Sequence, residues 1–230
     1  ISCSLVGSEM CIRDRNNGVT LENGVNALGN ININGGKISI YSNDDGIHAD
    51  GVLTISDGII DITKSYEGLE GLQVIINNGD ISIVSSDDGI NSTATSGQGI
   101  VIDGGNLYIL AGGDGLDSNS RTAYSGIVFK GGKTVVISTS GGNSAIDTEA
   151  GYTYTSGSVL AIMPNGGMTS EATHCSNFSS VAKKISMSLS SGKTLTVSVS
   201  NSAILSVKIP CNLSAIVIYL GSTSANISLN

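Results

Sequence analysis

The chain has 230 residues, of which 11 are Lys or Arg and 19 are Asp or Glu, giving a formal net charge of −8. Only 13% of the residues are charged and 40% are apolar, which excludes an acidic disordered tail because such tails lack the apolar residues of a core. An acidic chain without a basic cluster argues against nucleic acid or an anionic lipid surface as a partner and favours cations as ligands. The longest apolar runs, such as residues 215–220, fall far short of the roughly 20 residues that span a bilayer, so we expect no membrane span.

The first 15 residues share neither the composition nor the periodicity of the rest of the chain. Their sequence LVGSEMCIRD at residues 5–14 resembles a translated sequencing adapter. We therefore predict a non-native segment at residues 1–15, followed by a chain whose natural N-terminus is missing, and we leave this segment out of the fold prediction. A missing start also means that the lack of a signal peptide says nothing about secretion.

An internal repeat dominates the remaining sequence and is punctuated by glycines that follow a small residue, Asp or Asn. These glycines are Gly36, Gly58, Gly79, Gly105, Gly132 and Gly157, spaced by 22, 21, 26, 27 and 25 residues. Large apolar residues stand three and five positions before each glycine: Ile31 and Ile33, Leu53 and Ile55, Val74 and Ile76, Ile100 and Ile102, Ile127 and Phe129, Tyr152 and Tyr154. Apolar residues also stand two and four positions after the first four glycines. This period of two predicts β-strands joined at the glycines.

A third repeated element distinguishes a solenoid from a chain of hairpins. It reads Gly-Val, Gly-Ile or Gly-Leu followed by a polar residue, begins at Gly24, Gly46, Gly68, Gly89 and Gly115, and returns with Ala145 in place of Gly. Two short strands and a third apolar residue in every 21 to 30 residues predict a parallel β-helix, in which equivalent residues of successive coils stack. A β-sandwich of hairpins is the alternative architecture.

The repeat ends near Met168, and the segments 184–189, 193–199, 204–209 and 215–220 alternate without turn glycines or acidic elements. We predict a parallel β-helix over residues 16–167 and an antiparallel β cap over residues 168–230, because an open solenoid end exposes unpaired backbone groups. Cys175 and Cys211 lie in the cap, either as a disulfide or as free thiols.

Acidic residues recur at two positions of the third element. Immediately before its first residue stand Asp45, Glu67, Asp88 and Asp114, and two residues after it stand Asn26, His48, Glu70, Asn91, Asp117 and Asp147. In coils about 4.8 Å apart, neighbouring carboxylates of the first column would repel by roughly 3 kcal/mol per pair at an effective dielectric of 20. Calcium would neutralise them, since it accepts several carboxylate, amide and backbone oxygens in a flexible shell.

The densest acidic group contains Asp50, Glu67 and Glu70, and we predict the first calcium site there, whereas Glu171 lies outside the columns and is expected to take no part. The alternative is a row of solvated corners, because Asp and Asn beside Gly are ordinary turn formers. Neither an EF-hand loop nor a glycine-rich nonapeptide repeat is present in the sequence, so the metal prediction rests on geometry.

Three stretches carry a family resemblance: SNDDGIHADG at residues 42–51, SYEGLEG at 65–71 and SSDDGIN at 85–91, with Asn-Gly turns between them. They resemble the calcium-binding β-helix carbohydrate-binding family of cellulolytic and gut clostridia, over residues 16–230. The resemblance implies a right-handed parallel β-helix similar to pectate lyases, bound Ca²⁺, an extracellular or cell-surface location, and binding of acidic plant polysaccharide such as polygalacturonate or pectin, with cellulose as a further ligand. The metal-binding role carries over to Asp45, Asp50, Glu67, Glu70 and Asp88, while Asp114 and Asp117 lie in a less regular stretch.

Three functions follow: a non-catalytic carbohydrate-binding module, a calcium-dependent polysaccharide (pectate) lyase, and a structural surface solenoid. The first is our prediction, with no catalytic residue assigned and the oligomeric state left open. A lyase needs a base near the sugar C5 proton, and Lys64 is the only base close in sequence to the acidic group. The chain has no Trp for sugar stacking, and Tyr66 stands beside the acidic group. We therefore expect Tyr66 and Lys64 to contact a carbohydrate, and an acidic sugar bridged by calcium is better supported than cellulose.

Overall fold

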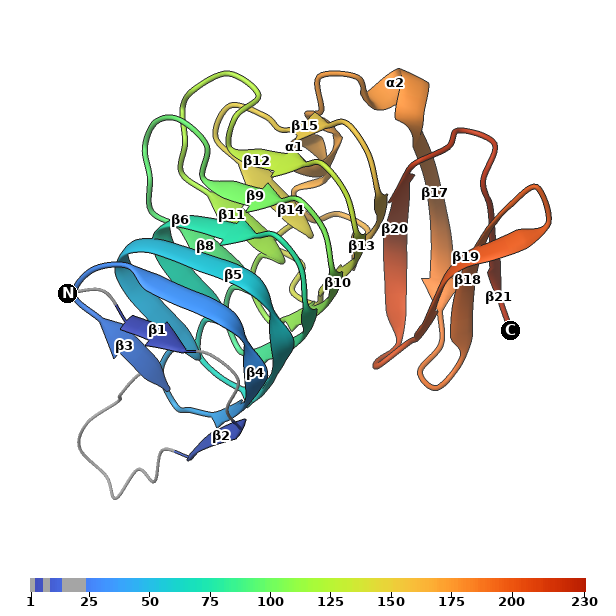
Figure 1. Ribbon diagram of the computed structural model, residues 1–230. Coiled ribbons are helices and arrows are strands. Elements are labelled where there is room, and N and C mark those ends of the chain that lie inside the picture. Colours follow the sequence, from blue (N-terminus) through green and yellow to red (C-terminus); the bar gives the residue numbers. More distant parts are fainter. Residues whose placement is uncertain (1–2, 6–8, 14–23) are drawn as a thin grey trace.

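The structure is a computed structural model that describes residues 3–5, 9–13 and 24–230, the first two stretches by their backbone alone. Strands account for 57% of the residues and helices for 4% (Figure 1). About six coils stack into a solenoid, and an antiparallel unit closes its C-terminal end. The predicted parallel β-helix with a C-terminal β cap is therefore confirmed.

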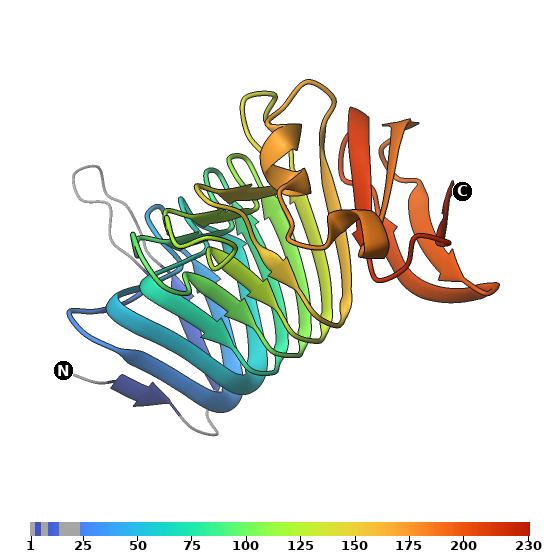
Figure 2. The same ribbon diagram turned by 90° about the horizontal axis from the view of Figure 1, so that it is seen from above.

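Every coil contributes a strand segment to each of three parallel faces. The first face contains β3 (Val25–Ala27), the starts of β5 (Ile47–Lys64) and β6 (Leu69–Ile76), β8 (Ile90–Ser92), β11 (Leu116–Ser118) and β14 (Ile146–Thr148). The second contains the start of β4 (Ile31–Tyr41), the middle of β5, the end of β6, β9 (Ile100–Ile102), β12 (Ile127–Phe129) and β15 (Thr153–Tyr154). The third contains the ends of β4 and β5, β7 (Asp80–Ser85), β10 (Asn106–Ala111), β13 (Lys133–Ser138) and β16 (Ser158–Pro164). Figure 2 shows these strands side by side along the solenoid.

The parallel pairing rules out the β-sandwich of hairpins. Equivalent residues of successive coils are in register, as in the column of Ile33, Ile55, Ile76, Ile102 and Phe129. The apolar residues before and after the turn glycines are buried, as predicted, and form one continuous core. The chain turns from the second face to the third at glycines with a positive φ, for example Gly58 (φ 125°) and Gly79 (φ 120°). Residues other than glycine rarely adopt this backbone conformation.

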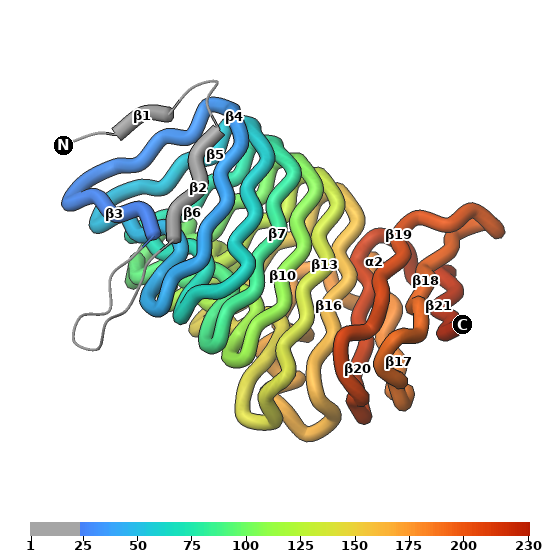
Figure 3. The backbone as a smooth tube through the Cα atoms, turned by 90° about the horizontal axis from the view of Figure 1, so that it is seen from below, coloured from blue at the N-terminus to red at the C-terminus, as the bar shows by residue number. Residues whose placement is uncertain are grey.

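The cap extends the third face and then covers its outer surface. β20 (Leu213–Leu220) pairs antiparallel with β16, and β17 (Ala182–Leu189) pairs antiparallel with β20. The cap sheet is a separate antiparallel sheet of β19 (Ser202–Lys208), β18 (Thr194–Val199) and β21 (Asn226–Leu229), in that order. Its apolar residues, such as Leu195 and Val197, form a second core with Ile137 and Leu160, which point outward from the solenoid. Figure 3 shows the cap sheet beyond the last coils.

Two short helices join the solenoid to the cap, α1 (Thr169–Thr173) and α2 (Phe178–Val181), and the alternation of the sequence predicts neither of them. Cys175 and Cys211 are free thiols, so the disulfide alternative is not realised in this structure. In the part of the chain that the structure describes, no helix is long and apolar enough to cross a membrane.

The predicted non-native segment lies partly outside the described residues. Its described backbone forms β1 (Cys3–Leu5) and β2 (Glu9–Arg13), which both pair in parallel with β4. The open edge of a solenoid offers unpaired N–H and C=O groups, so a segment that lacks the repeat can also pair there.

Candidate functional site

The structure brings both acidic columns together along the edge where the chain enters the first face. The second column is in register from coil to coil: Asn26, His48, Glu70, Asn91, Asp117 and Asp147. Backbone hydrogen bonds align the first column, since the amides of Gly46, Gly68 and Gly89 donate to the carbonyls of Glu67, Asp88 and Asp114 at 2.9, 3.0 and 2.9 Å. We call these two columns the acidic edge.

Aspartates of the first column also hold the next coil in place through their side chains. Asp45 Oδ1 accepts the amide N–H of Glu67 at 3.2 Å, Asp88 Oδ1 accepts that of Asp114 at 2.7 Å, and Asp114 Oδ1 accepts that of Ser144 at 2.5 Å. Each carboxylate is thereby oriented by the backbone of the next coil, to which one of its two oxygens is hydrogen-bonded. This arrangement fixes the directions in which the acidic edge presents negative charge.

His48 forms the centre of the first acidic group. Its Nδ1 lies 3.0 Å from Asp45 Oδ2 and 2.5 Å from Glu70 Oε2, and its Nε2 lies 3.1 Å from Asp50 Oδ1. The candidate ligand atoms of Asp45, His48 and Glu70 all lie within 4.8 Å of one another. Partial burial lowers the pKa of His48, but hydrogen bonds and charges from Asp45, Glu70 and Asp50 raise it more, so its net pKa is raised.

Glu67 lies beside this group rather than in it. Asn91 Nδ2 donates to both carboxylate oxygens of Glu67, at 3.1 and 3.2 Å. Burial, together with the charges of Glu70 and Asp45, raises the pKa of Glu67 to about 8. Burial, followed by a hydrogen bond with Asp45, raises the pKa of Glu70 to about 7. The predicted trio of Asp50, Glu67 and Glu70 is therefore not one direct cluster: Glu67 lies beside the His48 group, and the ring of His48 contacts Asp50 through one nitrogen and Glu70 through the other.

A second acidic group occupies the later coils. Burial is the main cause that raises the pKa of Asp88 to about 6, and of Asp114 and Asp117 to about 7, and neighbouring carboxylates raise all three further. Burial and the charge of Glu171 also raise the pKa of Asp147. This group differs from the first because its members influence one another without a histidine between them.

The second group opens into a pocket of about 310 Å³ at the junction with α1. The pocket is lined by Asp117, Asn119, Asp147, Thr148, Glu149, Met168 and Glu171. Glu171 lies outside the two columns, as the sequence indicates, but α1 folds back over the last coil and brings it to the pocket beside Asp147. The sequence does not predict that Glu149 and Glu171 line this pocket, since neither belongs to a repeated position. Asp147 does belong to the second column, although the sequence alone assigns it to no site.

The two predicted carbohydrate contacts have different surroundings. Tyr66 is 48% exposed, and its hydrogen bond with Asp87 raises the pKa of its hydroxyl. Lys64 Nζ donates to Asn43 Oδ1 at 2.5 Å and lies 5.1 Å from the centre of the Tyr41 ring. Tyr66 thus stands exposed at the acidic edge, whereas Lys64 is engaged by the preceding coil.

Fold and site together define a parallel β-helix with a carboxylate-lined edge and an antiparallel cap. A family model described as "carbohydrate-binding domain-containing protein" matches residues 4–99 and residues 70–224. The chain belongs to this family, and both the family and the solenoid fold support a carbohydrate-binding role. The two matches overlap at residues 70–99, as expected for repeated coils. Comparisons with curated proteins and with solved structures give no match.

Proposed function

We propose that this domain binds acidic polysaccharide through calcium ions held on the acidic edge, and that it works outside the cell or at the cell surface. Polygalacturonate, the backbone of pectin, is the proposed ligand. In this arrangement, Ca²⁺ bound to protein carboxylates also takes oxygens from the uronate carboxylates of the polysaccharide. Calcium suits this role because its coordination shell is large, flexible and made of oxygens.

The observation that carries the proposal is the second acidic group with its pocket. Asp88, Asp114 and Asp117 are partly buried, yet each lies near other carboxylates that raise its pKa. Buried carboxylates close to one another must be protonated or neutralised by a cation. A pocket lined by Asp117, Asp147, Glu149 and Glu171 gives a cation access from solvent. The donor set is made of oxygens, which fits calcium better than a transition metal.

The first acidic group is the weaker of the two proposed calcium positions. There His48 already supplies a positive charge to Asp45 and Glu70 when it is protonated. A calcium ion bound by Asp45, Asp50, Glu67 and Glu70 would therefore compete with the His48 proton. We place the first ion to bind in the second group and a second, pH-sensitive ion in the first group.

The lyase alternative gains no support from the geometry around Lys64. A base for C5 proton abstraction must reach the sugar held by the metal. The ammonium of Lys64 is instead hydrogen-bonded to Asn43 and packed over Tyr41. We therefore propose binding without cleavage.

The test is polygalacturonate binding, measured by calorimetry in calcium and in chelator, with ultraviolet absorbance followed for unsaturated products. We expect binding in calcium, release by chelator and no growth of absorbance. Asp117→Asn removes a ligand charge from the second group while keeping the shape of the side chain, and it should weaken calcium binding by about tenfold.

Asp57→Asn is the matched control, because Asp57 is exposed at a turn between the second and third faces. Equal calcium affinities for the two variants would overturn the assignment of the metal to the acidic edge. Steady formation of unsaturated product, lost in Lys64→Ala, would replace the binding module with a lyase.

A further inference from the structure

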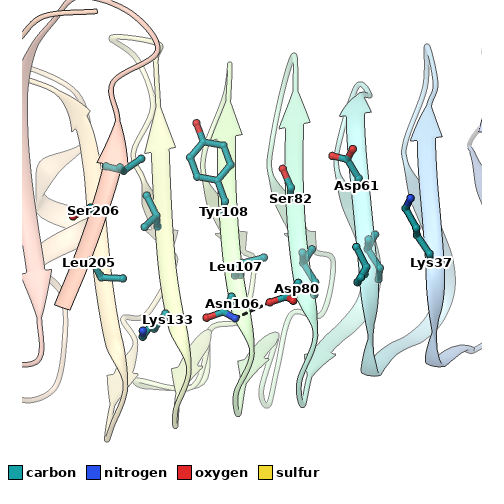
Figure 4. A pocket seen from close by; sticks show the side chains of 15 residues that line it. Lys37, Asp61, Asp80, Ser82, Asn106, Leu107, Tyr108, Lys133, Leu205 and Ser206 are labelled. Atoms are coloured by element: carbon teal, nitrogen blue, oxygen red, sulfur yellow. Dashed lines mark hydrogen bonds between the residues drawn. The ribbon is translucent and has the colours of Figure 1, made fainter. Parts of the chain in front are cut away.

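The third face of the solenoid carries a groove that lies away from the acidic edge. Its outermost row of side chains runs across five strands in register: Lys37, Ile59, Asp80, Asn106 and Lys133. All five are exposed. The next row contains Asp61, Ser82, Tyr108 and Val135, which also point outward. Figure 4 shows both rows, with Lys37 at one end and Leu205 and Ser206 at the other.

The cap sheet turns this face into a groove because it covers only the later coils. Its edge strand β19 lies above the third face and contributes Leu205, Ser206 and Val207 to the wall, while the strands of the solenoid form the floor. The groove has a volume of about 480 Å³. A second hollow of about 410 Å³ continues it around the turn glycines and shares Ile59, Asp80 and Asn106 with it. A linear ligand therefore has a continuous path across the coils.

The lining combines apolar surface with balanced polar groups. Ile59 is 50% exposed, and Tyr108 and Leu205 are apolar neighbours in the same groove. Two Lys and two Asp line it, so their formal charges cancel. Asn106 Nδ2 donates to Asp80 Oδ1 at 2.6 Å, which fixes an amide and a carboxylate side by side on the floor. β19 pairs with β18 alone among residues 24–230, so its other edge also offers backbone donors and acceptors.

Sugars match this combination because each ring has an apolar C–H face and a rim of hydroxyls that both donate and accept hydrogen bonds. The balanced charge favours an uncharged sugar, because the attraction of an acidic sugar to Lys37 and Lys133 would be offset by its repulsion from Asp61 and Asp80. The floor repeats every strand, at about 4.8 Å, a distance comparable to the length of one sugar unit in an extended glycan. A chain lying across the strands would then meet similar groups at each step.

We propose that this groove is a second carbohydrate site, which binds an uncharged extended glycan without calcium. The proposal rests on the carbohydrate-binding family and on the groove, and it is independent of calcium at the acidic edge. The cap sheet takes a direct part in it, since β19 forms one wall. The domain would then hold two kinds of polysaccharide on two faces, one through metal and one through direct contacts.

The test is calorimetric titration in chelator with a panel of neutral hexasaccharides: cellohexaose, xylohexaose and mannohexaose. We expect at least one of them to bind. Ile59→Asp places a charge on the apolar floor and should weaken that binding by about tenfold, the lower end of the range for losing one methylene-sized contact in an apolar pocket. Leu72→Asp is the matched control, because Leu72 is 48% exposed and lies between the first and second faces, and it should bind as the unchanged protein does.

A second variant, Ser82→Arg, fills the middle of the groove and should abolish binding, with unfolding midpoints confirming that all variants fold. Glu70→Gln separates the two sites: it should leave neutral glycan binding unchanged, and Ile59→Asp should leave polygalacturonate binding in calcium unchanged. The groove proposal is overturned if no hexasaccharide binds in chelator, or if Ile59→Asp and Leu72→Asp bind equally. Polygalacturonate binding in calcium alongside such a result would leave the acidic-edge proposal intact.

Discussion

His48 occupies a position in the second column where neighbouring coils carry Asn26 and Glu70. Its ring bridges carboxylates of two coils, with Nδ1 facing Asp45 and Glu70 and Nε2 facing Asp50. A protonated imidazole therefore neutralises the neighbouring carboxylates, as a bound cation would. It does so only at a pH low enough to keep the ring protonated. The first acidic group consequently contains its own competitor for calcium.

Replacing His48 by Asn should strengthen calcium binding to the first group. At pH 6 the protonated His48 repels the ion, and Asn is already accepted in this column at Asn26 and Asn91. The gain should be smaller at pH 8 than at pH 6, because fewer His48 rings carry a proton at the higher pH, although the raised pKa of His48 delays this loss. Calcium titrations of both proteins at the two pH values measure this difference.

His174→Asn provides the control, since the chain has two His and the ring of His174 lies against Tyr124. Its calcium affinity should equal that of the unchanged protein at the first group. A loss of calcium affinity in His48→Asn would mean that the imidazole is a metal ligand rather than a competitor.

At the scale of the strand, the glycines that open the first face set how closely the coils stack. A Cβ added to Gly68 would lie 2.3 Å from the carbonyl oxygen of Gly89 and 2.3 Å from Cγ2 of Ile83. Gly24, Gly46, Gly89 and Gly115 meet the next coil in the same way. Ala145 stands at this position in the last coil, where β14 pairs with β11 on one side and α1 follows instead of a seventh coil. Packing against the next coil therefore explains why Gly recurs and why the exception falls at the end.

Gly68→Ala should consequently lower the free energy of unfolding by about 1–3 kcal/mol, the range for overpacking a core. Gly141→Ala should have a small effect, because nothing lies within 4 Å of a Cβ at Gly141 and its φ is not positive. Urea denaturation of both variants compares the two. Equal losses would show that stacking at the first face does not require glycine.

At the scale of the whole molecule, the acidic edge makes folding without metal depend on protons. Glu67, Glu70, Asp114 and Asp117 have pKa values of about 8, 7, 7 and 7 in the folded chain, well above those of exposed carboxyls. The folded state therefore binds more protons than the unfolded state between about pH 5 and 8, and stability must fall as the pH rises through this window. The raised pKa of His48 acts in the same direction.

We expect the chelated protein to unfold at a lower temperature at pH 8 than at pH 5.5. Saturating calcium should remove or reverse this trend, because protons compete with the metal and calcium therefore binds better at the higher pH. A ligand present at 100 times its Kd stabilises the fold by about 2.7 kcal/mol. Thermal unfolding at both pH values, with calcium and with chelator, tests this. Midpoints that are independent of pH in chelator would show that the edge carboxylates keep ordinary pKa values.

The solenoid follows from the amino-acid sequence alone, because each coil repeats the same apolar spacing and glycine turns. Register follows from the repeat as well: residues such as His48, Glu70 and Asn91 occupy equivalent positions and therefore stack. The alternation over residues 184–189, 193–199, 204–209 and 215–220 also predicts four cap strands, which the structure places at 182–189, 194–199, 202–208 and 213–220. It does not predict β21 or the two helices. The acidic composition likewise favours cations as ligands, since negative charge on the chain attracts them.

The grouping of these residues into sites depends on the tertiary fold. Glu171 reaches Asp147 because α1 folds back onto the last coil, and Lys64 turns to Asn43 because its side chain follows the third face rather than the acidic edge. The groove beside β19 exists because the cap sheet covers part of the third face. The sequence does not predict this groove, because the alternation within each strand does not indicate where two sheets pack together. Repeats fix the distances between stacked coils, whereas contacts between the solenoid and nonrepeating segments depend on the path of the chain, which local pattern does not encode.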